Sequence, residues 1–171
     1  MKDRFGFNSK VLLLLFSEYK MLDYQTLDTI ADSYTPLLAI LCLGYLAKSL
    51  YRKEFTAFKT LGLFVIYSLA VSYGIMFWDN HFNIWPAFEL DYSTHTAVAL
   101  SLVVSLCLMV RSLSRLWIAS LLMYMTLMEY QDYHSLADML STALVVGIFL
   151  APFSVRILKQ TSSDAIMESN S

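Results

Sequence analysis

The chain has 171 residues, of which 57% are hydrophobic and 15% charged, and its formal net charge at pH 7 is −2. A soluble domain of this length cannot bury so much apolar side chain, whereas a lipid bilayer accommodates it, so the sequence predicts one membrane domain. The slightly acidic balance offers no basic stripe to neutralise phosphates, which argues against a nucleic-acid partner.

The N-terminal segment, residues 1–35, mixes apolar residues with charges. Its longest early apolar run, residues 11–16, is too short for a signal peptide, so we expect the N-terminus to be retained. Residues 9–31 cannot cross hydrocarbon unaided, and we expect an N-terminal interfacial helix lying on the membrane. The alternative is an even number of spans with the N-terminus inside.

Four stretches approach the roughly 20 apolar residues that a helix needs to cross a bilayer core of about 30 Å, and a fifth candidate, residues 36–47, is shorter still. In chain order the five are residues 36–47, 58–78, 94–113, 116–128 and 138–158. Asp32 or Ser33 is expected to cap the first of these helices, with Pro36 in its first turn. The fold class predicted is all-α: a transmembrane bundle of about five helices over residues 36–158, followed by a disordered cytoplasmic tail, residues 159–171.

Basic residues beyond position 47 fall in alternate connecting segments. They are Lys48, Arg52, Lys53 and Lys59, then Arg111 and Arg115, then Arg156 and Lys159. The loops between them, residues 79–92 and 129–137, contain no Lys or Arg. The positive-inside rule places the basic segments in the cytoplasm. We therefore expect a bacterial inner-membrane protein whose two non-basic loops face the periplasm.

The three histidines all lie in or beside these two non-basic loops. Six carboxylates accompany His81, His95 and His134: Asp79, Glu89, Asp91, Glu129, Asp132 and Asp138. Ionisable groups near membrane depth are costly, so their concentration at one end predicts a functional site.

The helices that follow His95 and His134 both begin at this end. Ser93 is a plausible cap for the first, and Asp132 or Ser135 for the second. Converging helix N-termini present free N–H groups and positive dipole ends, which favour an anion. Asp138 is four residues after His134, so one helical turn places the pair on one face.

Two segments carry a resemblance to a known family. Asp91-Tyr-Ser-Thr-His95-Thr-Ala-Val-Ala resembles the Pro-Ser-Gly-His-Thr segment of the type-2 phosphatidic acid phosphatase superfamily. Tyr133-His134-Ser-Leu-Ala-Asp138 is similar to its later His-x-x-x-Asp segment, and one helical hairpin separates the histidines, as in that family. The resemblance implies a membrane lipid phosphatase that hydrolyses a lipid phosphate monoester or diphosphate without a metal or other cofactor.

The resemblance also implies a role for each matching residue. His134 attacks phosphorus and forms a phosphohistidine, Asp138 orients His134, and His95 protonates the leaving oxygen. Ser93 and Thr94 surround the phosphate oxygens, and Asp91 contributes to substrate binding.

The chain departs from the family by lacking its phosphate-binding cations. It has no Lys or Arg between Lys59 and Arg111, and Met128 stands six residues before His134, where the family has Arg. Asp91 instead resembles the sphingomyelin-synthase branch, which implies transfer of a lipid phospho-headgroup. A non-catalytic protein that binds lipid phosphate is the third possibility.

Other classes of function are open. His81, His95 and His134 with carboxylates are potential zinc ligands of a membrane hydrolase, although no tight ligand motif is present. Glu129-x-Gln131 with Asp91-x-x-x-His95 faintly resembles the VanZ-like small membrane proteins. A transporter is not favoured, because the spans contain no mid-span carboxylate or Lys.

Overall fold

The computed structural model describes the backbone of residues 9–169 and the side chains of residues 24–160. Within these ranges all regular secondary structure is helical, with no strand. The helices are α1 (Ser9–Tyr51), α2 (Phe55–Phe82), η1 (Pro86–Phe88), α3 (Thr94–Met109), η2 (Arg111–Leu113), α4 (Ser114–Tyr130) and α5 (Leu136–Ser169). The predicted all-α fold is confirmed.

Three segments are long and apolar enough to cross a membrane: Tyr24–Tyr51, Phe55–Phe82 and Leu136–Gln160. They indicate an integral membrane protein. The helices α3 and α4 have 16 and 17 residues, or about 25 Å each at the usual rise per residue, which is shorter than a typical span.

The helix α1 corrects the predicted start of the first span. It is continuous through Pro36, so neither Asp32 nor Ser33 caps a new helix. Pro36 has no backbone N–H and so removes one intrahelical hydrogen bond. The helix continues on both sides of it, where no glycine occurs before Gly44. The predicted interfacial segment is therefore not separated from the span by a break, and its residues 1–8 lie outside the described part.

The other end of the chain also differs from expectation. The backbone of α5 is helical to Ser169, whereas we expected disorder from residue 159. Residues 160–169 contain no Pro or Gly that would stop the helix.

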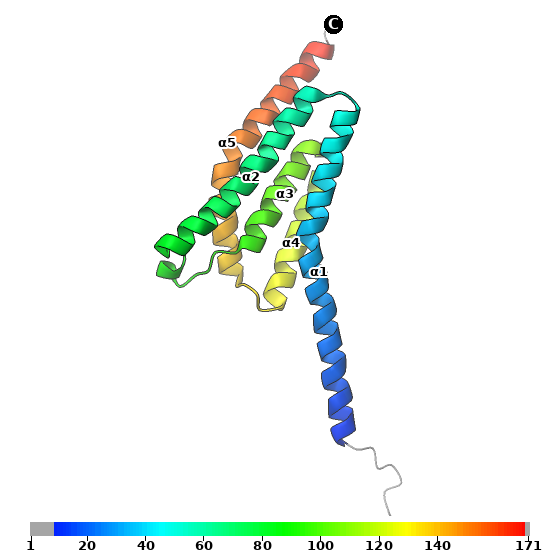
Figure 1. Ribbon diagram of the computed structural model, residues 1–171, viewed down its shortest axis with the longest axis vertical. Helices are drawn as coiled ribbons and strands as arrows, with labels where there is room; N and C mark the ends of the chain where they lie inside the picture. The colour runs from blue at the N-terminus through cyan, green and yellow to red at the C-terminus, as the bar shows by residue number, and fades with distance from the viewer. Residues whose placement is uncertain (1–8, 170–171) are drawn as a thin grey trace, which may run out of the picture.

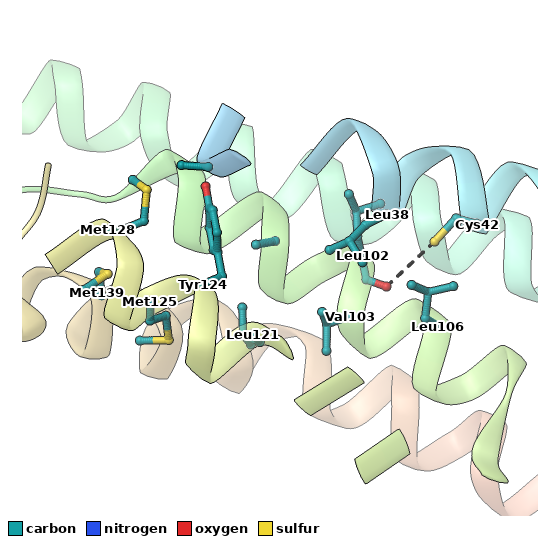
Figure 2. Close-up of a cluster of buried hydrophobic side chains, with 12 residues drawn as sticks. Leu38, Cys42, Leu102, Val103, Leu106, Leu121, Tyr124, Met125, Met128 and Met139 are labelled. Carbon is teal, nitrogen blue, oxygen red and sulfur yellow. Dashed lines mark hydrogen bonds between the residues drawn. The ribbon is translucent and has the colours of Figure 1, made fainter. Parts of the chain in front are cut away.

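The helix α3 occupies the centre of the bundle and contacts α1, α2, α4 and α5 (Figure 1). On one side it packs with α1 and α4 in an apolar cluster that includes Leu38, Leu102 and Met128. Cys42 lies in this cluster as a buried free thiol whose Sγ approaches the Leu102 carbonyl oxygen at 3.8 Å (Figure 2).

On the other side α3 shares a second apolar cluster with α2 and α5, which includes Phe64, Ala97 and Val146, and it also contacts α2 through small polar residues. Ser68, Ser72 and Ser101 are fully buried. The hydroxyls of Ser72 and Ser101 are 2.8 Å apart, and Ser101 Oγ donates to the Ser68 carbonyl at 3.1 Å. Small side chains of this kind let two helices approach closely.

The two kinds of loop lie at opposite ends of the bundle. The α1–α2 and α3–α4 connections are at one end, and residues 83–93 and 131–135 are at the other (Figure 1). At the basic end, Arg111 Nη2 donates to the Leu158 carbonyl oxygen at 3.4 Å. The fold thus separates the basic segments from the two histidine-bearing loops.

Candidate functional site

The non-basic end contains a polar cavity of about 470 Å³. Three residues predicted for the site line it: His134, Asp91 and Thr94. The other lining residues are Met76, Asp79, Asn80, Asn83, Pro86 and Tyr92. The cavity therefore joins the end of α2, the start of α3 and the α4–α5 loop in one space. The remaining predicted site residues, His95, Ser93 and Asp138, do not line it.

Asp138 is a structural residue of the first turn of α5. Its Oδ2 accepts from the Ser135 backbone N–H at 2.9 Å and from Ser135 Oγ at 2.7 Å, and Ser135 Oγ accepts from the Asp138 N–H at 3.2 Å. This reciprocal pair is a capping box, with aspartate in the usual place of glutamate. Of the two caps considered for this helix, Ser135 is the one observed.

Asp138 also joins the two histidine-bearing segments. Its Oδ1 accepts from the Asp91 backbone N–H at 2.8 Å, and Ser93 N–H donates to Thr142 Oγ1 at 3.1 Å one turn further along α5. Within the described side chains, no hydrogen bond joins Asp138 to His134. Each carboxylate oxygen of Asp138 already accepts from a backbone N–H, and the orientation of His134 by Asp138 stays a prediction.

Ser93 caps α3 and is not exposed to a ligand. The side chain is fully buried, its Oγ donates to Thr96 Oγ1 at 2.9 Å, and it accepts from the Thr96 N–H at 3.3 Å. The predicted cap is confirmed, whereas the predicted contact of Ser93 with phosphate oxygens is not available in this conformation. In the described part of the chain, the N–H groups of Thr94 and His95 have no acceptor, as expected for the first turn of a helix.

Asp79 and Trp85 shape the loop above the cavity. Asp79, the last buried residue of α2, accepts from the Trp85 N–H at 2.7 Å through Oδ1, and Trp85 Nε1 donates to Ser141 Oγ at 2.9 Å. The Trp85 ring packs edge-on against Tyr92, and the Tyr92 hydroxyl donates to the Ser72 carbonyl at 2.8 Å. This loop is therefore fastened to both α2 and α5, which gives the cavity a fixed wall.

The charges around His134 affect its protonation. Partial burial lowers the pKa of His134 below its usual 6.5, and the nearby charge of His95 lowers it further, while the carboxylates of Asp138 and Asp91 oppose the shift. Burial, together with the Asp79 carboxylate, raises the pKa of the Tyr92 hydroxyl. His134 is thus a neutral imidazole near neutral pH, and His95, which is exposed, is close enough to influence it.

Sequence reasoning placed Asp79 among the carboxylates of this end but missed Asn80 and Asn83, which follow it at the end of α2. Asp79, Asn80 and Asn83 line the cavity, and Asn83 ends the helix in a left-handed conformation with φ 51°. Asp79 and Asn83 are four residues apart, so their spacing was a usable signal for a shared polar face. The third histidine, His81, lies outside the cavity, exposed and packed edge-on against Phe82.

The zinc-hydrolase alternative gains no support from the geometry. Among the described side chains, no group of three or more His, Cys, Asp or Glu is arranged to hold a metal ion.

Compared with known proteins, the chain matches no family model, no curated protein and no solved structure. The functional argument therefore depends on the residues and their arrangement.

Proposed function

We propose that this protein is an integral membrane enzyme that transfers the phosphoryl group of a lipid phosphoester, with His134 as the nucleophile. One observation carries the proposal: His134, Asp91 and Thr94, which come from both halves of the family resemblance, line a single polar cavity. The resemblance and this shared cavity support lipid-phosphate hydrolysis as the leading reaction.

The protonation of His134 suits the attacking role. A neutral imidazole has a free ring nitrogen that forms a bond to phosphorus while the bond from phosphorus to the leaving oxygen breaks. In this proposal His95, in its protonated form, gives its proton to that leaving oxygen. Water then attacks the phosphohistidine, His95 takes up the proton, and free His134 and phosphate are released.

The donors near the site partly replace the missing cations. The free N–H groups of Thr94 and His95 lie at the positive end of the α3 dipole, where negative charge is stabilised. Losing a preorganised donor usually costs about a hundredfold or more in rate. We therefore expect a slower enzyme than a phosphatase whose site holds Lys and Arg.

A second function is favoured by the acidity of the cavity. Asp79 and Asp91 line it, and no Lys or Arg is among its nine lining residues. Two carboxylates attract an amine or quaternary ammonium group more readily than a phosphate dianion. Transfer of a phospho-headgroup that carries a positive charge, with a lipid alcohol in place of water, is thus the alternative reaction.

The membrane arrangement proposed has five spans, in which α3 and α4 also cross the bilayer. The basic end then faces the cytoplasm and the cavity faces the periplasm of a bacterial inner membrane. Labelling of single cysteines introduced at Asn83 and Asp132 tests this: both react with an impermeant reagent added outside whole cells, and a cysteine at Arg52 does not.

The reaction is tested with the purified protein in detergent. Phosphate release is measured from phosphatidate and a prenyl diphosphate, and headgroup transfer from a phosphocholine lipid to diacylglycerol. His134→Gln is expected to lower the active reaction by at least about a thousandfold. His81→Gln is the matched control, because that histidine lies outside the cavity, and it retains activity.

The outcomes separate the possibilities. Activity that disappears in His134→Gln and resists chelator supports the histidine mechanism, whereas loss with chelator supports the metal-dependent hydrolase. Equal activity of the two histidine variants contradicts the role of His134 as nucleophile. No reaction with any lipid contradicts the proposed enzyme and favours a binding protein.

A further inference from the structure

The helix α1 contacts the loop that carries His134 through two hydrogen bonds. Tyr24 OH donates to the backbone carbonyl oxygen of Gln131 at 2.9 Å, and Tyr133 OH donates to Asp28 Oδ1. Gln131 and Tyr133 are the third and the first residue before His134. Both bonds therefore attach α1 to the short segment that directly precedes the proposed nucleophile.

The α1 residues of this contact share one face of the helix. Tyr24, Asp28 and Asp32 are each four residues apart, so they follow one another along one side of α1. The hydrogen bond to Asp28, together with the nearby charges of Asp28 and Asp32, raises the pKa of Tyr133 to about 12. The Tyr133 hydroxyl therefore keeps its proton at neutral pH and remains the donor of this bond.

The position of His134 depends on the residues that flank it. In the part of the chain that the structure describes, the His134 side chain makes no hydrogen bond of its own. On one side of it, Ser135 is held by Asp138 in the capping box of α5. On the other side, the Tyr133 side chain bonds to Asp28 of α1. The imidazole is thus placed by a segment that is attached to α5 at one end and to α1 at the other.

The helix α1 also extends past this loop. It begins at Ser9 and protrudes from the bundle at the end that bears the α4–α5 connection (Figure 1). The same helix is continuous to Tyr51, which lies at the opposite end of the bundle. Because a continuous helix moves as a rigid element, a change in the direction of the protruding part displaces Tyr24 and Asp28.

We propose that Tyr133 is a positioning residue, which holds the His134 imidazole at the cavity through its hydrogen bond to Asp28, with Tyr24 as a second attachment of the loop to α1. The helix α1 thereby controls the placement of the imidazole. The inference rests on the proposed function for the role of His134 as nucleophile, whereas the placement itself is measured without any reaction.

The placement is tested by nuclear magnetic resonance of the purified full chain in detergent, with ¹⁵N-labelled histidines. Burial lowers the pKa of His134 below 6.5, while the charges of His95 and of two carboxylates also act on it. Tyr133→Phe removes one hydroxyl and changes none of these charges. It releases the loop from α1, so the pKa of His134 should rise toward 6.5 as water reaches the imidazole. An unchanged pKa of His134 in this variant overturns the proposal.

Matched substitutions show whether the bond itself is responsible. Tyr130→Phe removes the same atom from the last residue of α4, which is 71% exposed and makes no hydrogen bond among the described residues, and the pKa of His134 should stay unchanged. Asp28→Asn keeps an acceptor oxygen and should also leave it unchanged, whereas Asp28→Leu should reproduce the effect of Tyr133→Phe. If Tyr130→Phe acts like Tyr133→Phe, or if the effects of Asp28→Leu and Tyr133→Phe add in the double variant, the proposal fails.

Kinetics separate this proposal from the proposed function. With a lipid that reacts, Tyr133→Phe should lower kcat about tenfold and leave KM within about twofold, because the imidazole is misplaced while the cavity is retained. Equal kcat for Tyr133→Phe and Tyr130→Phe overturns the positioning role even if the reaction depends on His134. No reaction with any lipid, combined with the expected rise in the pKa of His134, contradicts the proposed reaction and supports the placement by α1.

Discussion

Replacing Asp138 distinguishes a structural carboxylate from one that acts on the histidine. Asp138→Ala leaves the Asp91 N–H, which is partly buried, without its acceptor, at a cost of about 1–2 kcal/mol. It also removes half of the capping box with Ser135, which is worth about 1 kcal/mol. We therefore expect the free energy of unfolding to decrease by about 2–3 kcal/mol, and by about half of that for Asp138→Asn, which keeps one acceptor oxygen.

The measurement is unfolding in mixed detergent micelles, followed by circular dichroism. Asp132→Asn is the control: Asp132 is exposed in the same loop with φ 56°, a conformation that Asn also adopts, so its effect should stay within about 0.5 kcal/mol. If Asp138→Ala is as stable as the control while phosphate release disappears, the structural reasoning fails and the carboxylate orients His134 as the resemblance implies.

Three further predictions concern buried polar groups. Burial lowers the pKa of His134, so as the pH falls the unfolded chain takes up a proton at this histidine before the folded protein does. The free energy of unfolding should therefore be constant above pH 6.5 and decrease below it. In a pH series, His134→Gln should make that decrease smaller. Gln131 is 3% exposed with both side-chain amide atoms unpartnered, so Gln131→Leu should raise the free energy of unfolding by about 1 kcal/mol in the same assay. Ser72→Leu should lower it by about 1–3 kcal/mol through overpacking against Ser101, whereas Ser72→Ala should cost less than about 1 kcal/mol.

Hydropathy and charge were sufficient to predict much of the architecture. Apolar length predicted the helices, and the alternation of basic segments predicted which loops share an end, because a helix that crosses the bundle must exchange ends. The start of the first span was wrong, since Pro36 marks a helix start only as a tendency and is tolerated within α1. The position of α1 in the bundle depends on its packing against α3 and α4, and the local motif at Pro36 gives no information on that packing.

The sequence predicted at which end of the bundle the site lies, but not which hydrogen bonds its residues make. Loop composition brought His134, Asp91 and Thr94 to one end, and the fold places them around one cavity. Asp138 is four residues after His134, which predicted that the two side chains are within reach of each other. Asp138 is also three residues after Ser135, and this second spacing is that of a capping box. Backbone donors at Asp91 and Ser135 occupy the carboxylate, and the Asp91 donor comes from a segment 47 residues away, so no local pattern predicts it.

The residues around this site fall into two groups: those that stabilise the fold and those that line the cavity. Asp138 is buried and ties the start of α5 to the backbone before α3, and the buried Ser93 side chain caps α3, so stability alone explains both residues. Asp91 is exposed and His134 half-buried, and both line the cavity at this end of the bundle. The side-chain amide of Gln131, three residues before His134, is buried without a hydrogen-bond partner, although an apolar side chain would be more stable there. If Gln131→Leu stabilises the protein and also lowers its activity, the unpartnered amide serves the reaction. Proteins commonly retain such destabilising groups at functional sites.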